Sequence, residues 1–189
     1  MKDKRNIFLE GKKVILRPLN KETDLQLCYE WINDREIMQF LNRVFPISFT
    51  QEESWFDSRD ERDDIILAIE QKDKLGIIGT MGLHRIDWVS RIGTAGALIG
   101  DKDLWGKGLG TDAQLSVLGY AFEALNLQKV EASCWAFNHR SHQHLQKCGY
   151  RKEGRLKKHI FRNGKYYDQI LMAVFKKDWQ KAWNRHYSD

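Results

Sequence analysis

The chain has 189 residues, of which 42% are hydrophobic and 30% are charged, and its formal net charge is +5. This length suits one domain with a core of its own, and the composition excludes a disordered chain. Because no apolar run approaches the roughly 20 residues that cross a bilayer, we expect no membrane partner. The first ten residues are charged and lack the apolar stretch of a secretory signal. We therefore expect a single domain over residues 1–189.

Cysteine usage and charge indicate the compartment and the kind of partner. Cys28, Cys134 and Cys148 are odd in number and widely spaced, and their spacing matches no metal-binding motif. This pattern indicates a protein of the reducing cytoplasm. The positive net charge favours an anionic partner, such as a phosphate-rich cofactor, an acidic protein or a nucleic acid. The densest basic stretch runs from Arg151 to Lys165.

The first third of the chain predicts one short strand and two helices. Val14–Leu16 is apolar and reads as a strand, and Asp24–Asn33 has the apolar spacing of a helix that starts at Thr23 or Asp24. Thr50–Glu53 has the pattern of a capping box, which predicts a second helix reaching about Ser58.

Three β-prone runs follow, and turn-forming residues separate them. The turns are expected at Asp73-Lys74 and at Ser90-Arg91. The three predicted strands are Ile65–Glu70, Gly76–Leu83 and Gly93–Ile99.

After Ile99 the pattern alternates between helix and strand. Apolar residues at Leu118, Ala121, Phe122 and Leu125 have the spacing of a helix. The order of strands followed by a strand–helix–strand crossover predicts a mixed α/β sheet. The remaining elements are a strand at Lys129–Trp135, a short helix from about His139 to Cys148 with Asn138 before it and Gly149 as a left-handed cap, and strands at Leu156–Phe161 and Tyr167–Phe175 joined by the turn Asn163-Gly164.

A glycine-rich loop, Leu104–Thr111, lies between a predicted strand and a predicted helix. Glycines allow the backbone to approach a ligand closely, and a helix N-terminus attracts anions. With Lys107 beside them, Gly106, Gly108 and Gly110 fit a pyrophosphate site, although the same glycines also fit a flexible loop before a helix. The spacing G-x-G-x-G fits neither a P-loop nor a dinucleotide-binding fingerprint.

The loop and several later motifs resemble the GNAT family of N-acetyltransferases. Gly108 and Gly110 match the glycines of its coenzyme-A loop, Q/R-x-x-G-x-G/A, while Trp105 stands where that pattern has Gln or Arg. Further motifs resemble the branch that contains the ribosomal-protein N-terminal acetyltransferases of the RimJ/RimL type. They are Leu16–Leu19, Asn138–Ser141 followed by Lys147–Tyr150, Glu153–Leu156 and the hairpin Asn163–Asp168.

The resemblance implies a single-domain α/β (α+β) fold with a mixed, mostly antiparallel central sheet flanked by helices. The sheet would be splayed between Gly93–Ile99 and Lys129–Trp135, and the pantetheine arm of acetyl-coenzyme A (acetyl-CoA) would lie in the gap. The cofactor-binding residues that the resemblance implies are Leu98, Ile99, Trp105, Gly106, Lys107, Gly108, Leu109, Gly110, Thr111, Asn138, Ser141 and Lys147.

Acetyl transfer from a thioester to an amine needs a proton acceptor for the amine, a donor for the oxyanion and a proton for the leaving thiolate. The resemblance assigns the oxyanion to a backbone N–H near Leu98 or Ile99. It assigns the catalytic acid to Ser141, since Leu145 replaces the tyrosine that many relatives use for this role. The resemblance to the ribosomal branch assigns the catalytic base to Glu153.

Each of these assignments has an alternative. Ser141 also fits a residue that starts the helix or binds the cofactor, and Glu153 also fits a surface carboxylate paired with a neighbouring arginine. Thr94 stands where related enzymes carry an acid, so His84 and Asp87 are reserve candidates for the base.

Three functions remain open at this point. The first is acetyl-CoA-dependent N-acetylation of an amine acceptor, either a small molecule such as a polyamine or amino sugar, or a protein N-terminus, by a monomer or homodimer. The second is a non-catalytic acyl-CoA-binding module, which Leu145 and Thr94 favour. The third is a ribosome- or nucleic-acid-binding protein, which Arg151–Lys165 favours, although we expect no nucleic-acid partner.

The histidines of the short helix do not predict a metal site. His139 and His142 share one side of a helix, but His144 does not align with both, and no carboxylate lies nearby in the sequence. We therefore expect no metal cofactor.

Overall fold

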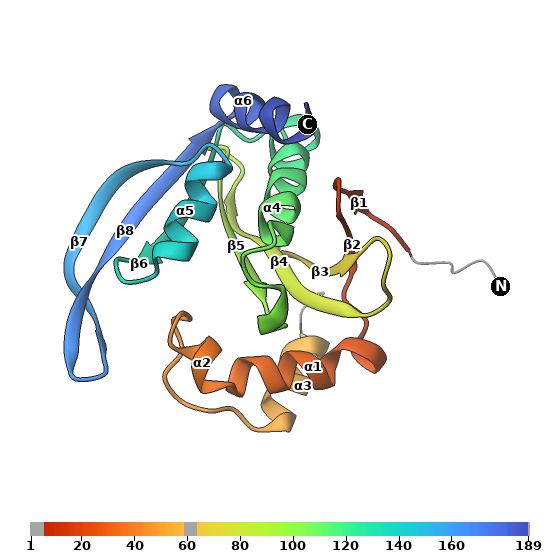
Figure 1. The fold of residues 1–189 in the computed structure, drawn as a ribbon, viewed down its shortest axis with the longest axis vertical. Coiled ribbons are helices and arrows are strands. Elements are labelled where there is room, and N and C mark those ends of the chain that lie inside the picture. The colour runs from red at the N-terminus through yellow and green to blue at the C-terminus, as the bar shows by residue number, and fades with distance from the viewer. Residues whose placement is uncertain (1–5, 59–63, 189) are drawn as a thin grey trace.

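An eight-stranded sheet forms the centre of the computed structural model, which describes residues 6–58 and 64–188 (Figure 1). The strand order is β1-β2-β3-β4-β5-β6-β8-β7, and the neighbours are antiparallel except for β5 and β6. This confirms the expected mixed, mostly antiparallel sheet. The strands are β1 (Leu9–Glu10), β2 (Val14–Pro18), β3 (Ile65–Gln71), β4 (Ile77–Asp87), β5 (Ile92–Ile99), β6 (Lys129–Trp135), β7 (Arg151–Arg162) and β8 (Lys165–Phe175).

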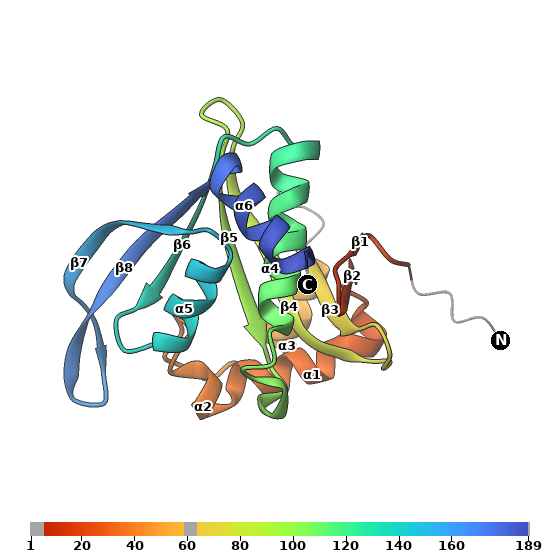
Figure 2. The ribbon, with the colours of Figure 1, turned by 45° about the horizontal axis from the view of Figure 1, so that its top comes forward.

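The sheet is splayed between β5 and β6, as the family resemblance implies. The two strands pair only where Ile92–Thr94 lies beside Lys129–Glu131. Beyond this point β5 stays bonded to β4 and β6 stays bonded to β8, so the two halves of the sheet diverge (Figure 2). Residues 95–99 and 132–135 therefore face a gap instead of a neighbouring strand.

Helices cover both faces of this sheet. Leu67 and Ile69 of β3 pack in the core beneath α4 and α6, whereas Ala68 packs in the core beneath α1 and α3, because successive strand residues point to opposite faces. None of the helices in the described ranges is long and apolar enough to cross a membrane. They are α1 (Lys21–Asn33), α2 (Arg35–Met38), α3 (Phe49–Asp57), the 3-10 turn η2 (Lys102–Leu104), α4 (Leu109–Gly119) with its π-helical extension η3 (Tyr120–Ala124), α5 (His139–Lys147) and α6 (Lys176–Tyr187).

Helix α1 begins earlier than its predicted start at Thr23 or Asp24. Asn20 is the N-cap, and its side chain accepts hydrogen bonds from the N–H groups of Glu22 and Thr23. Asp24 instead lies buried, 2.7 Å from the Arg17 guanidinium. The prediction was wrong because the Asp24 carboxylate pairs with Arg17 and accepts a hydrogen bond from the Asn20 N–H at 2.8 Å, which leaves the N-cap position to Asn20.

The capping box of the second predicted helix is also displaced. Ser48 and Gln51 form it, in place of Thr50 and Glu53, so α3 starts at Phe49. Both pairs fit the same sequence pattern, and the local sequence alone does not choose between them.

The later elements follow the prediction more closely, apart from their boundaries. Gly149 has a left-handed backbone with φ of 92°, as predicted, and Asn163 and Gly164 form the turn between β7 and β8. Strand β7 starts at Arg151 rather than Leu156, because pairing with β8 carries a polar segment into the sheet. The elements β1, α2 and α6 were not predicted.

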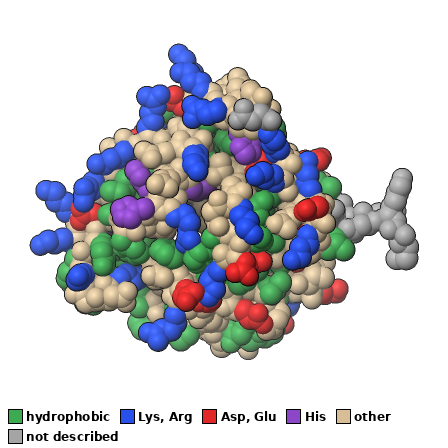
Figure 3. Space-filling model, viewed as in Figure 1, with side chains coloured by type: hydrophobic (Ala, Val, Ile, Leu, Met, Phe, Trp, Pro, Cys, Tyr) green, Lys and Arg blue, Asp and Glu red, His purple; other side chains and the backbone are tan. Residues whose placement is uncertain are grey.

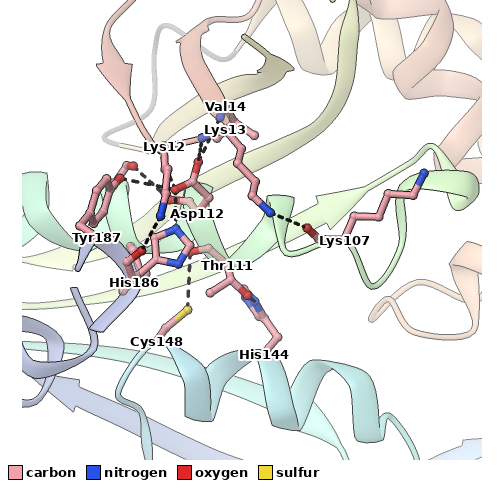
Figure 4. A network of polar contacts seen from close by, with 12 residues as sticks. Lys12, Lys13, Val14, Lys107, Thr111, Asp112, His144, Cys148, His186 and Tyr187 are labelled. Carbon is pink, nitrogen blue, oxygen red and sulfur yellow. Dashed lines mark hydrogen bonds and ion pairs between the residues drawn. The ribbon is translucent and has the colours of Figure 1, made fainter. Parts of the chain in front are cut away.

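Asp112 joins three distant parts of this fold (Figure 4). It is fully buried at the start of α4, and its carboxylate accepts hydrogen bonds from the N–H groups of Lys12, Lys13 and Val14 at 2.7–3.0 Å. His186 Nε2 of α6 lies 2.7 Å from the same carboxylate. Burial raises the pKa of Asp112, but these hydrogen bonds outweigh burial and the net pKa is lowered. The ionised carboxylate thus fixes both chain ends to α4.

We expect Asp112→Asn to lower the free energy of unfolding at pH 7 by at least about 2 kcal/mol, because buried N–H groups lose a charged acceptor. A carboxyl with a lowered pKa stabilises the fold above its unfolded pKa of about 4, and this contribution disappears as pH falls through the folded pKa. The difference between wild type and variant should therefore shrink near pH 3, as measured by urea unfolding. Asp57→Asn, which changes an exposed partner of Lys21, should cost at most about 1 kcal/mol. An equal decrease in the free energy of unfolding in the two variants would contradict the anchoring role of Asp112.

Candidate functional site

The gap between β5 and β6 opens into a cavity of about 520 Å³. Its walls are the unpaired stretches 95–99 and 132–135, and its ends are the glycine loop before α4 and the inner side of α5. Backbone N–H and C=O groups on these two facing edges lack a strand partner in the described part of the chain. Apart from the Ile99 carbonyl, which accepts a hydrogen bond from Trp105 Nε1 at 2.7 Å, they are available to a ligand that lies between the strands as an added strand would.

The glycine loop contains positive φ angles that residues with a side chain rarely adopt. Gly106 and Gly108 have φ of 79° and 82°, and Gly108 is the N-cap of α4 without any side-chain cap. A Cβ atom added at either glycine would meet no atom within 4 Å, so the conformation and not crowding requires glycine there. The uncapped N–H groups of the first turn of α4, from Leu109 to Thr111, open on the cavity and suit an anion.

The structure places eleven of the twelve expected cofactor-binding residues at the cavity. The exception is Lys107, which is not among the lining residues; its carbonyl accepts a hydrogen bond from Lys13 Nζ at 3.5 Å. The eleven expected residues that line the cavity are Leu98, Ile99, Trp105, Gly106, Gly108, Leu109, Gly110, Thr111, Asn138, Ser141 and Lys147.

Ser141 lies in the first turn of α5 and faces the cavity. Its backbone N–H donates to the Asn138 side chain at 3.1 Å, which is the N-cap bond of the helix. No hydrogen bond from the Ser141 hydroxyl to another described residue is present. Asn138 therefore performs the capping, and the hydroxyl of Ser141 remains available to a ligand.

Glu153 lies elsewhere. Its carboxylate is exposed on β7 and lies 3.3 Å from Lys129 Nζ, which also contacts Glu131 at 2.7 Å. Lys129 belongs to the end of β6 that is still paired with β5, whereas the cavity begins beyond it. The fold does not bring Glu153 and Ser141 together, and Glu153 is not among the residues that line the cavity.

The reserve candidates are also outside the cavity lining. Asp87 accepts hydrogen bonds from the N–H groups of Val89 and Ser90 and so shapes its own turn. His84 Nδ1 lies 3.5 Å from Asp64, and Thr94 lies in the paired segment of β5. In the described ranges, no cluster of His, Cys, Asp and Glu is arranged to hold a metal ion.

Sequence reasoning missed three polar residues of the cavity. His144 Nδ1 lies 3.2 Å from Thr111 Oγ1, and burial, with Lys147 nearby, lowers the pKa of His144 to about 4, so its imidazole is neutral at pH 7. Gln114 is buried in the cavity wall and donates to the Tyr150 hydroxyl at 3.0 Å. Arg140 lies next to Ser141 in α5. Their spacing to Ser141 and Thr111 along α5 and α4 was the available signal.

The charge of the cavity is positive. Among the described residues, Arg140 and Lys147 are its charged lining side chains, and no carboxylate lines it. Figure 3 shows lysines and arginines spread over the visible face of the molecule, with a group at the left edge over β7 and β8. The site thus suits an anionic ligand.

Comparison with known proteins identifies the family. A human alpha/beta-tubulin-N-acetyltransferase 9 is 30% identical over 159 residues, which cover 78% of this chain and 76% of that protein. The SPbeta prophage-derived uncharacterized N-acetyltransferase YokL of Bacillus subtilis is 28% identical over 176 residues, which cover 92% and 96%. The crystal structure of spermidine N-acetyltransferase from Vibrio cholerae in complex with CoA and spermine superposes with a TM-score of 0.80 at 26% identity, covering 88% of this chain and 98% of that one.

The names of all three relatives contain N-acetyltransferase, and two of them give different acceptors, tubulin and spermidine. The family model described as Acetyltransferase (GNAT) domain matches residues 13–151, which include β5, the glycine loop, β6 and α5. The residues that line the cavity lie inside this matched segment, with the exception of Gln169 of β8. The chain is therefore an acetyltransferase that belongs to the GNAT domain family.

Proposed function

We propose that this protein transfers the acetyl group of acetyl-CoA directly to an amine while both substrates are bound. The observation that carries the proposal is the cavity between β5 and β6, which joins unpaired strand edges to the glycine loop. The pantetheine arm would lie along the edges, where its amides match free backbone groups. Its pyrophosphate would lie at the N-terminus of α4.

The reaction needs few groups beyond this arrangement. The amine nitrogen attacks the thioester carbonyl, and the N–C bond forms as the carbonyl oxygen becomes an oxyanion that a backbone N–H near Leu98 or Ile99 stabilises. The C–S bond then breaks, and the thiolate takes a proton. We propose the free hydroxyl of Ser141 as the donor of this proton. The surplus proton of the amine passes through water to Ser141 and restores its hydroxyl, because no carboxylate lines the cavity in the described part of the chain.

The positive lining also bears on the acceptor. At pH 7 about one in ten α-amines is neutral, since their pKa is about 7.7–8.0, whereas a lysine-like amine with a pKa near 10.4 is almost fully protonated. A cavity lined by Arg140 and Lys147, without a lining carboxylate, offers a polycation no negatively charged side chain to pair with. We therefore propose an acceptor whose amine has a low pKa, with the α-amine of a protein N-terminus ahead of a polyamine.

The cofactor site is tested at Gly108. Gly108→Leu should weaken binding of acetyl-CoA at least tenfold, because its side chain would project where the pyrophosphate must approach the loop. Gly164→Leu is the matched control, since Gly164 also has a positive φ of 77° and open space around it but lies in the β7–β8 turn. Calorimetry measures both affinities. Unchanged affinity in a folded Gly108→Leu protein would remove the loop from the site.

The acid is tested by comparing Ser141→Ala with Glu153→Gln. If Ser141 donates the proton, its loss should lower kcat about a hundredfold with little effect on the KM for acetyl-CoA. If Ser141 only binds the cofactor, the change should appear mainly in KM. Glu153→Gln tests the base that the sequence suggests; because Glu153 lies at Lys129 and not at the cavity, we expect kcat within about threefold of wild type. A hundredfold loss in Glu153→Gln would restore it as the base.

The acceptor class is tested by measuring release of free CoA with a panel of amines. We expect kcat/KM for a lysine-free peptide with an unblocked N-terminus to exceed that for spermidine at least tenfold at pH 7.5. The same peptide with a blocked N-terminus should not react. A higher kcat/KM for spermidine would reject the proposed acceptor class but keep the acetyltransferase, whereas CoA binding without turnover of any amine would favour a non-catalytic module.

A further inference from the structure

Arg140 crosses the open end of the gap between the two halves of the sheet. It lies in the first turn of α5, and its guanidinium carbon is 3.7 Å from the centroid of the Trp105 ring and 5.3 Å from that of Phe40. Trp105 is held in turn, because its Nε1 donates to the Ile99 carbonyl at 2.7 Å. The guanidinium thus has a defined position beside the glycine loop.

The charge of Arg140 has no carboxylate partner within residues 6–58 and 64–188. Three arginines do have such partners: Arg17 pairs with Asp24, Arg151 with Asp178 and Arg155 with Asp168. Partial burial lowers the pKa of Arg140, but arginine stays cationic at neutral pH. Stacking on Trp105 uses the face of the guanidinium and leaves its N–H edge free for hydrogen bonds.

The free N–H edge of Arg140 lies at the cavity that holds the uncapped first turn of α4. Arg140, Trp105, Gly106 and Gly108 all line this cavity. A planar guanidinium binds phosphate oxygens in pairs and is better suited to them than a point charge. Position 105, where the resembled pattern has Gln or Arg, carries Trp in this chain, and Arg140 stacks on that same ring.

We propose that Arg140 binds a phosphate group of CoA and that Trp105 serves as the platform that orients it. The proposal rests on CoA binding in the cavity, and it adds a residue from α5 to the loop that the sequence identifies. The phosphate is either part of the pyrophosphate or the 3′-phosphate of the ribose, and both offer the same chemistry to the guanidinium. In either case the CoA phosphate would lie between Arg140 of α5 and the glycine loop.

The test compares Arg140→Met, which keeps the length of the side chain, with wild type by calorimetry. Three ligands are titrated: CoA, 3′-dephospho-CoA and pantetheine, which has no phosphate. We expect Arg140→Met to weaken CoA binding at least about tenfold and to leave pantetheine binding unchanged. If Arg140→Met also weakens binding of 3′-dephospho-CoA, Arg140 binds the pyrophosphate. If the two proteins bind 3′-dephospho-CoA equally, Arg140 binds the 3′-phosphate. Arg140→Lys, which keeps the charge without the planar geometry, should recover part of the affinity.

Lys177→Met is the control for net charge, because Lys177 is exposed on α6 and is not among the residues that line the cavity. It should bind CoA within twofold of wild type. The proposal is overturned if Arg140→Met binds CoA like wild type, if Lys177→Met loses as much affinity, or if pantetheine binding falls equally, which would show that Arg140 only supports packing. Failure of the wild-type protein to bind CoA would reject the proposed function itself.

Discussion

The short pairing between β5 and β6 is the constraint on which the site depends. Three residue pairs hold the strands together, and beyond them each strand is bonded only to its outer neighbour. A sheet cannot leave buried backbone groups unpaired without cost, so the gap is stable only where a ligand or solvent satisfies them. The cavity is therefore a direct consequence of strand divergence, and the helices at its ends supply the side chains.

The two ends of the chain are tied to this arrangement through α4. Asp112 comes directly after the last residue of the glycine loop. Its carboxylate accepts hydrogen bonds from the turn before β2 and contacts His186 of the last helix. Figure 4 shows the three segments meeting at this side chain. Since α4 carries the uncapped N–H groups of the loop, the anchoring of its first turn positions the anion-binding end of the cavity.

The positive charge of the cavity bears on both substrates, the anionic donor and the amine acceptor. The uncapped start of α4, Arg140 and Lys147 favour a phosphate-rich ligand, and no lining carboxylate in the described ranges opposes them. The same absence leaves no group to draw a proton from a strongly basic amine. The proposed preference for an amine that is already partly neutral is thus compatible with the proposed binding of an anionic donor, because both are argued from the same positive lining.

The sequence by itself determined the elements with strong local signals and the loop at the site. Gly106 and Gly108 require a positive φ, Asn138 caps α5, and the apolar patterns of β3 to β6 fix their faces. Local patterns could not determine the partners of charged groups, because these depend on residues distant in the chain. Arg17 pairs with Glu70 of β3 as well as with the nearby Asp24, and Asp112 contacts residues from both chain ends. For the same reason only the tertiary structure decided that Glu153 lies with Lys129 while Arg140 meets Trp105 at the cavity.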